Sequence, residues 1–172
     1  MIIGKLLGTE TLGVYDLSKT LVNKMVDLVR TVISKVALPI LSNSNNNDDV
    51  VRSRFLVMTK VVAYIVIPIG VVIALFSREI LWIVYGGDYT GAFIIVTVFA
   101  FISIINSICS FFDMLGVAKG RTDLNFYNTI VRIVITIPIV CITSLFSIEI
   151  VAYGQLVATF LQSIIFWMIV VN

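Results

Sequence analysis

The stretch LVMTKVVAYIVIPIGVVIALF, residues 56–76, decides the fold class of this chain. Lys60 is its only charged residue, and about 20 apolar residues in a helix are enough to cross the hydrocarbon core of a bilayer. The whole chain agrees, because 59% of its residues are hydrophobic and 13% are charged, with a mean hydropathy of +1.09. Soluble domains carry about 25% charged residues. The sequence therefore predicts an all-α integral membrane protein with about five transmembrane helices.

Turn signals separate the other apolar stretches from this one. They are SNSNNNDD at residues 42–49, Tyr85-Gly86-Gly87-Asp88 and Lys119-Gly120-Arg121. We expect one transmembrane domain over residues 1–172, with helices at about 12–41, 56–76, 91–115, 124–146 and 148–171. Pro68 and Pro138 fall inside two of these helices, where neighbouring helices can satisfy the freed carbonyl groups.

The first residues, MIIGKLLG, lack the basic region, long apolar region and cleavage site of a signal peptide. They read as the end of a helix that began upstream. We therefore expect the chain to be a fragment of a longer protein.

The loops between the expected helices alternate sides of the membrane. One side holds Arg52, Arg54, Lys119 and Arg121. The other side holds fewer basic residues, together with most of the acidic loop residues: Lys5, Arg78, Glu10, Glu79, Asp88 and Glu149. The positive-inside rule makes the first side cytoplasmic, and it places the C-terminus there as well.

Composition argues against several function classes. The chain has no histidine, which removes the commonest catalytic base and metal ligand. Cys109 and Cys141 each lie in an apolar run and are interpreted as packing residues, with no metal or disulfide spacing. A net charge of +2 gives no reason to expect a nucleic-acid partner. We predict no catalytic residue, metal or cofactor.

The helix at 12–41 is unusual because it carries many ionisable groups. A charge at the bilayer centre costs about 2.5–3.5 kcal/mol on insertion scales, so these groups are not expected to face lipid. At 100° per residue, one face holds Asp16, Asn23, Asp27, Arg30 and Ser34, with Lys19, Lys24 and Lys35 at its flanks. This face is expected to look into water or onto charged partners.

Three later helices carry weaker polar stripes. They consist of Ser103, Asn106, Ser107 and Ser110; of Asn125, Asn128, Thr129, Arg132, Thr136 and Thr143; and of Gln155, Thr159, Gln162 and Ser163. Stripes that point to a common axis would enclose a hydrated cavity. Its predicted cationic substrate-binding residues are Lys19, Lys24, Arg30 and Arg132, and its predicted polar lining is Asn23, Ser34, Asn128 and Thr136. Lys and Arg suit phosphate groups, which favours an anionic substrate. Asp16 and Asp27 are candidates for ion coupling.

Simpler interpretations of these residues stay open. Serine and threonine commonly pack transmembrane helices together. Lys19, Lys35 and Arg132 could extend to the membrane interface, and Asp27 could pair with Arg30. The whole helix at 12–41 could also lie on the membrane surface.

An ordered set of segments resembles a known family. GKLLGTETLGVYDLSKTL at 4–21 and VALPILS at 36–42 are followed by IPIGVVIALFSREILWIVYGGDYTGA at 67–92 and LGVAKGRTDLNFYN at 115–128. Together they resemble the second lobe of polysaccharide or O-antigen repeat-unit flippases (the Wzx type). These belong to the multidrug/oligosaccharidyl-lipid/polysaccharide exporter superfamily.

The resemblance implies about twelve helices in two lobes, of which this chain would supply the eighth to the twelfth. The implied activity is flipping of an undecaprenyl-pyrophosphate-linked oligosaccharide across the bacterial inner membrane. A lumen lined by basic residues is typical of the family, and Lys19, Lys24, Arg30 and Arg132 fit that role. The implied partners are membrane lipids, the lipid-linked oligosaccharide, the missing first lobe, and polysaccharide polymerase and chain-length machinery.

Three other functions remain as alternatives. A multidrug exporter of the same superfamily would prefer an acidic cavity for cationic drugs. An intramembrane lipid-modifying enzyme would need paired carboxylates or histidine, but Asp16 and Asp27 lie about three helical turns apart. A structural subunit would have no path for a solute.

Overall fold

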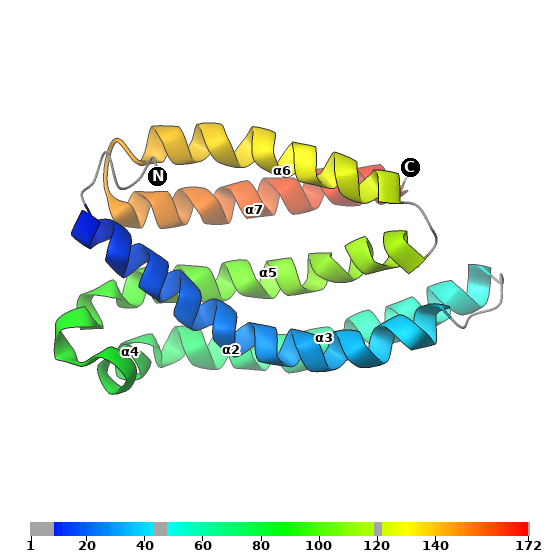
Figure 1. Ribbon diagram of the computed structural model, residues 1–172, viewed down its shortest axis with the longest axis horizontal. Helices are drawn as coiled ribbons and strands as arrows, with labels where there is room; N and C mark the ends of the chain where they lie inside the picture. The colour runs from blue at the N-terminus through cyan, green and yellow to red at the C-terminus, as the bar shows by residue number, and fades with distance from the viewer. Residues whose placement is uncertain (1–8, 43–47, 119–121, 172) are drawn as a thin grey trace.

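The computed structural model describes residues 9–42, 48–118 and 122–171 (Figure 1). Every element in these ranges is a helix. They are α2 (Thr9–Ser42), α3 (Asp48–Leu75), α4 (Ser77–Tyr85), the 3-10 helix η1 (Gly87–Ala92), α5 (Phe93–Ala118), α6 (Thr122–Thr143) and α7 (Ile148–Val171). The prediction of an all-α membrane protein is confirmed.

Four segments within the described residues are long and apolar enough to cross a membrane. They are Leu56–Leu75, Gly87–Ser110, Phe126–Thr143 and Ile148–Ile165. Helix α2 is the fifth long helix, and it differs from the other four because ionisable side chains recur along it. It nevertheless runs in the same bundle and packs on α3 and α5.

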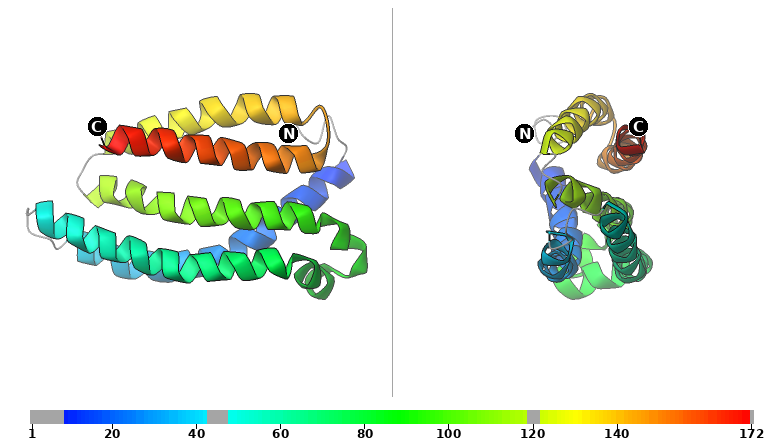
Figure 2. Two further views of the ribbon diagram at one scale, coloured as in Figure 1. Left: turned by 180° about the vertical axis from the view of Figure 1, so that it is seen from behind. Right: turned by 90° about the vertical axis from the view of Figure 1, so that its right-hand side faces the viewer.

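The five long helices of the described ranges form two groups. In the first group α3 packs on α5, and α2 lies obliquely across both; in the second, α6 and α7 form a hairpin (Figure 1). Helix α7 packs on α5 and so joins the groups, which are seen end-on in Figure 2. Helices α2, α5 and α7 run in one direction, and α3 and α6 run back.

The apolar core lies where α2, α3 and α5 meet. Val22, Val62 and Val96 are at most 1% exposed there, and Tyr15 of α2 contacts the ring of Phe99 on α5. In contrast, no residue of the Phe126–Thr143 segment of α6 is buried. The hairpin is therefore held mainly through α7, while α6 presents most of its surface to the surroundings.

One glycine in each group lets two helices approach each other closely. A Cβ atom at Gly70 of α3 would overlap the side chain of Ile104 on α5. At Gly154 of α7, an added Cβ would lie 2.7 Å from Thr143 Cγ2 on α6. Small residues commonly bring transmembrane helices together in this way.

The region between α3 and α5 differs from the turn expected around Tyr85-Gly86-Gly87-Asp88. The chain bends at Phe76 and forms α4 before it reaches those residues. Helix α4 ends because Gly86 adopts φ +89°, a conformation that glycine tolerates far better than other residues. The expectations for MIIGKLLG at 1–8, for most of the 42–49 linker and for Lys119-Gly120-Arg121 concern residues outside the described ranges.

Candidate functional site

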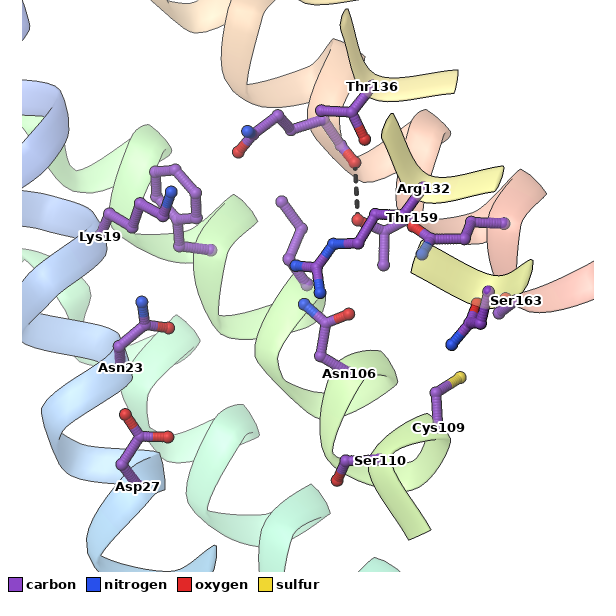
Figure 3. Close-up of a pocket in the computed structure, with 15 residues that line it drawn as sticks. Lys19, Asn23, Asp27, Asn106, Cys109, Ser110, Arg132, Thr136, Thr159 and Ser163 are labelled. Carbon is purple, nitrogen blue, oxygen red and sulfur yellow. Dashed lines mark hydrogen bonds between the residues drawn. The ribbon is translucent and has the colours of Figure 1, made fainter. Parts of the chain in front are cut away.

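A cavity of about 300 Å³ opens between α2 on one side and the α6–α7 hairpin on the other, with α5 between them (Figure 3). None of the α3 residues whose side chains the structure describes belongs to its lining. The lining residues are Lys19, Asn23, Asp27, Phe99, Ile102, Asn106, Cys109, Ser110, Asn128, Arg132, Thr136, Gln155, Thr159, Gln162 and Ser163. Most of these side chains are polar, although two of the helices that carry them, α5 and α7, are strongly apolar.

Helical periodicity explains how each wall is built. Helix α2 contributes Lys19, Asn23 and Asp27, and α6 contributes residues with the same four-residue spacing, 128, 132 and 136. Residues four apart lie on one helix face. Because α2 and α6 run in opposite directions, Lys19 and Thr136 lie toward one end of the cavity and Asp27 toward the other (Figure 3).

The hydroxyl groups in the lining mostly donate to their own helices. Thr159 Oγ1 donates to the Gln155 carbonyl at 2.8 Å, Ser163 Oγ to the Phe160 carbonyl at 2.8 Å, and Ser110 Oγ to the Ser107 carbonyl at 2.9 Å. Their oxygen atoms keep acceptor capacity toward a ligand. The amide and charged side chains therefore supply most of the donors that a ligand in the cavity would meet.

The charges on the lining are unequal. Lys19 on α2 and Arg132 on α6 are cations on facing walls, and Asp27 on α2 is a carboxylate. Among the described lining residues, two positive groups against one negative group leave one formal positive charge. Arg132 extends into the middle of the cavity in Figure 3. An arginine in this position offers a planar fork of donors that matches phosphate oxygens.

The structure brings together six of the ten predicted site residues. Lys19, Asn23, Asp27, Asn128, Arg132 and Thr136 all line the cavity. Lys24 and Asp16 are exposed and lie outside the lining. Lys24 directly follows Asn23, so its side chain is rotated by about 100° around the helix axis from the cavity-facing Asn23. The side chains of Arg30 and Ser34 lie outside the described residues, so their roles stay predictions.

Other lining residues were not predicted as site residues. Asn106, Ser110 and the polar residues of α7 belong to the stripes recognised in the sequence. Cys109, interpreted as a packing residue, lines the cavity as well, and its three-residue spacing from Asn106 could have indicated this. In contrast, Ser103 and Ser107 are buried, and Ser107 Oγ donates to the Ser103 carbonyl at 2.6 Å, so they pack the helix rather than line the cavity.

Comparison with known proteins places the chain in a family. Residues 1–94 match the sequence model of a family described as polysaccharide biosynthesis protein. The chain belongs to this family. With four candidate membrane spans in its described residues, it is a multi-pass membrane protein of this family.

Its relatives include proteins named for the polymers they help to make. The chain is 31% identical over 127 residues to teichuronic acid biosynthesis protein TuaB of Bacillus subtilis, covering 74% of this chain and 26% of that protein. It is 26% identical over 137 residues to amylovoran biosynthesis protein AmsL of Erwinia amylovora, covering 80% and 35%. The chain thus spans about a third or less of these relatives. No solved structure matches.

Proposed function

We propose that this chain is one lobe of a membrane transporter that flips an undecaprenyl-pyrophosphate-linked oligosaccharide across the bacterial inner membrane. The observation that carries the proposal is the polar cavity among apolar helices, with Lys19 and Arg132 on facing walls. The membership of the polysaccharide biosynthesis family supports it.

The cavity fits the chemistry of such a substrate. A pyrophosphate that leaves water needs its charge offset, and charge-assisted hydrogen bonds from Arg132 and Lys19 can supply this. The side-chain amides of Asn23, Asn106 and Gln162 can donate to and accept from sugar hydroxyl groups. Transport of this kind needs binding and a change of access, and no covalent step.

The same lining argues against the alternatives. Asp27 is the single carboxylate among the described lining residues, whereas a cationic drug would be favoured by an acidic cavity. A hydrolytic or transferase site would need a second acid or base within hydrogen-bond reach of the first. A purely structural subunit gives no reason for charged and amide side chains to converge.

In the complete transporter a second lobe would face this cavity, and Asp16 and Asp27 stay the candidates for ion coupling. Polysaccharide polymerase and chain-length machinery are the expected partners. The C-terminus is expected in the cytoplasm.

The test is deletion of the complete gene in the bacterium that carries it, with complementation by the full-length protein. We expect surface polysaccharide to be lost while lipid-linked repeat units accumulate and remain inaccessible from outside intact cells. Absence of the lipid-linked repeat unit would instead indicate an enzyme that assembles it. Normal surface polysaccharide in the deletion strain would also contradict the proposal.

A further inference from the structure

We propose that α4 is a membrane-interface segment whose exposed face lies in the lipid head-group layer. The partner is the phospholipid surface itself, and the side chains that enter it are Trp82 and Ile83. This inference rests on where the segment lies and what it exposes, and it does not depend on which substrate is transported.

The position of α4 follows from the length of the span before it. Leu56–Leu75 contains 20 residues, and at about 1.5 Å per residue it rises about 30 Å, the thickness of the hydrocarbon core. Helix α4 begins two residues later, at Ser77. The next candidate span, Gly87–Ser110, then returns the chain into the bilayer. Helix α4 therefore lies between two spans, at the level where lipid tails give way to head groups.

The inner face of α4 is firmly packed. Ser77 is 3% exposed and Leu81 is fully buried. The Thr97 hydroxyl of α5 lies 3.1 Å from the Ser77 hydroxyl and 3.3 Å from the Ala74 carbonyl, and its shortest hydrogen-bond contact is to the Phe93 carbonyl at 2.9 Å. These contacts determine which face of α4 points away from the bundle.

The outward face combines large apolar side chains with charges. Trp82 is 64% exposed and Ile83 is 73% exposed in the second turn, while Arg78 and Glu79 are exposed in the first turn. Tryptophan is enriched at the membrane–water boundary, because its ring is apolar and its N–H group is polar. With nine residues, α4 is too short to cross the bilayer, so its outward face matches the boundary rather than the interior.

The exposed apolar surface of α4 is continuous with the exposed apolar surface of the neighbouring membrane spans. Leu75, the last residue of α3, and Phe76, which follows it, are 73% and 53% exposed and connect the outward face of α4 to the apolar surface of α3. A second exposed group, Leu145 and Phe146, lies in the turn between α6 and α7, at the same end of the molecule (Figures 1 and 2). A bilayer surrounds the molecule and can cover both groups at one depth, whereas a partner protein docked on α4 would leave the second group uncovered.

The depth of Trp82 can be measured directly. The full-length protein would carry Trp82 as its only tryptophan, with Trp167 and any others replaced by phenylalanine. It would be reconstituted in phosphatidylcholine vesicles containing lipids brominated either near the head group or deep in the acyl chains. We expect shallow bromines to quench Trp82 emission several-fold more strongly than deep ones, with weak quenching by aqueous iodide.

A matched control is Ile65→Trp in a background where Trp82 is also phenylalanine. Ile65 is 39% exposed and lies near the middle of the Leu56–Leu75 span, so its quenching should be stronger with deep bromines. Strong iodide quenching of Trp82 with none from either lipid would place α4 in water and overturn the proposal. Absence of quenching by all three agents, with a normal Ile65→Trp control, would show that protein covers Trp82 and would overturn it as well.

Discussion

The ring of Tyr15 on α2 meets the ring of Phe99 on α5 edge to face, with ring centroids 5.2 Å apart. Both side chains are 3% exposed, and Phe99 also lines the cavity. The contact therefore connects the packed side of α2 to the wall of the candidate site. It fixes the rotation of α2 about its axis, which in turn directs Lys19, Asn23 and Asp27 toward the cavity.

Tyr15→Ala should destabilise the protein by about 3–5 kcal/mol, because it removes a large buried aromatic side chain and leaves a cavity. The Tyr15 hydroxyl is buried, and within the described part of the chain no hydrogen-bond partner for it is found. Tyr15→Phe should therefore be neutral or slightly stabilising, because it keeps the ring contact and removes an unsatisfied polar group. Thermal unfolding of the full-length protein in detergent measures both variants. Strong destabilisation by Tyr15→Phe would mean that the hydroxyl has a partner elsewhere in the complete protein.

Arg132→Ala should reduce export of lipid-linked glycan roughly tenfold or more, because a hydrogen bond to a charged group contributes about 1.5–3 kcal/mol. Arg132→Lys should retain part of the activity if charge alone matters, and little if a bidentate phosphate contact is made. The measurement is polysaccharide at the cell surface, with immunoblotting for protein abundance. Lys24→Ala is the matched control, because Lys24 is a cation on α2 that is exposed and lies outside the lining.

Equal loss of export in Lys24→Ala and Arg132→Ala would indicate that export depends on the protein's overall positive charge and not on Arg132 in the cavity. Full export in an Arg132→Ala, Lys19→Ala double variant at normal abundance would remove the main support for an anionic substrate in this cavity.

The spacing of polar residues in the sequence identified many of the cavity-lining residues, but not all of them. Lys19, Asn23, Asp27 and Arg132 could be assigned from the sequence, because polar residues at four-residue spacing stand out in apolar helices. The stripe on residues 103–110 divides between two roles that spacing cannot separate, since Asn106 and Ser110 face the cavity but Ser103 and Ser107 are buried. That distinction depends on which helices pack on α5, and this is a tertiary property.

The fold shows a similar limit at α4. The apolar span was evident from residues 56–76, and Gly86-Gly87 correctly marked a break in the chain. No helix was expected over the residues between them, SREILWIVY at 77–85. They form a separate helix because the chain bends at Phe76 and because Ser77 and Leu81 pack inward, which only the assembled bundle decides.

Gly154→Ala should weaken the α6–α7 hairpin. The added Cβ would lie 2.7 Å from Thr143 Cγ2 and 3.1 Å from Ile139 Cγ2, and overpacking of this kind costs about 1–3 kcal/mol. Gly91→Ala is the control, because nothing lies within 4 Å of an added Cβ there. Thr143→Ser removes the closest methyl group and keeps the hydroxyl that donates to the Ile139 carbonyl at 2.7 Å, so it should partly rescue Gly154→Ala. Thermal stability of the four proteins measures this, and equal stability of Gly154→Ala and the parent would show that the hairpin adjusts without strain.

The orientation in the membrane can be tested at two described positions that lie at opposite ends of the bundle. Asp88 in η1 and Ser53 near the start of α3 are both exposed. In a background with Cys109→Ser and Cys141→Ser, Asp88→Cys should react with an impermeant thiol reagent in intact cells. Ser53→Cys should react only after the cells are permeabilised, because Arg52 and Arg54 beside it place that end in the cytoplasm under the positive-inside rule. Labelling of Ser53→Cys but not Asp88→Cys in intact cells would invert the topology. The cavity end near Asp27 would then face outward, and the lipid layer around α4 would be that of the inner leaflet.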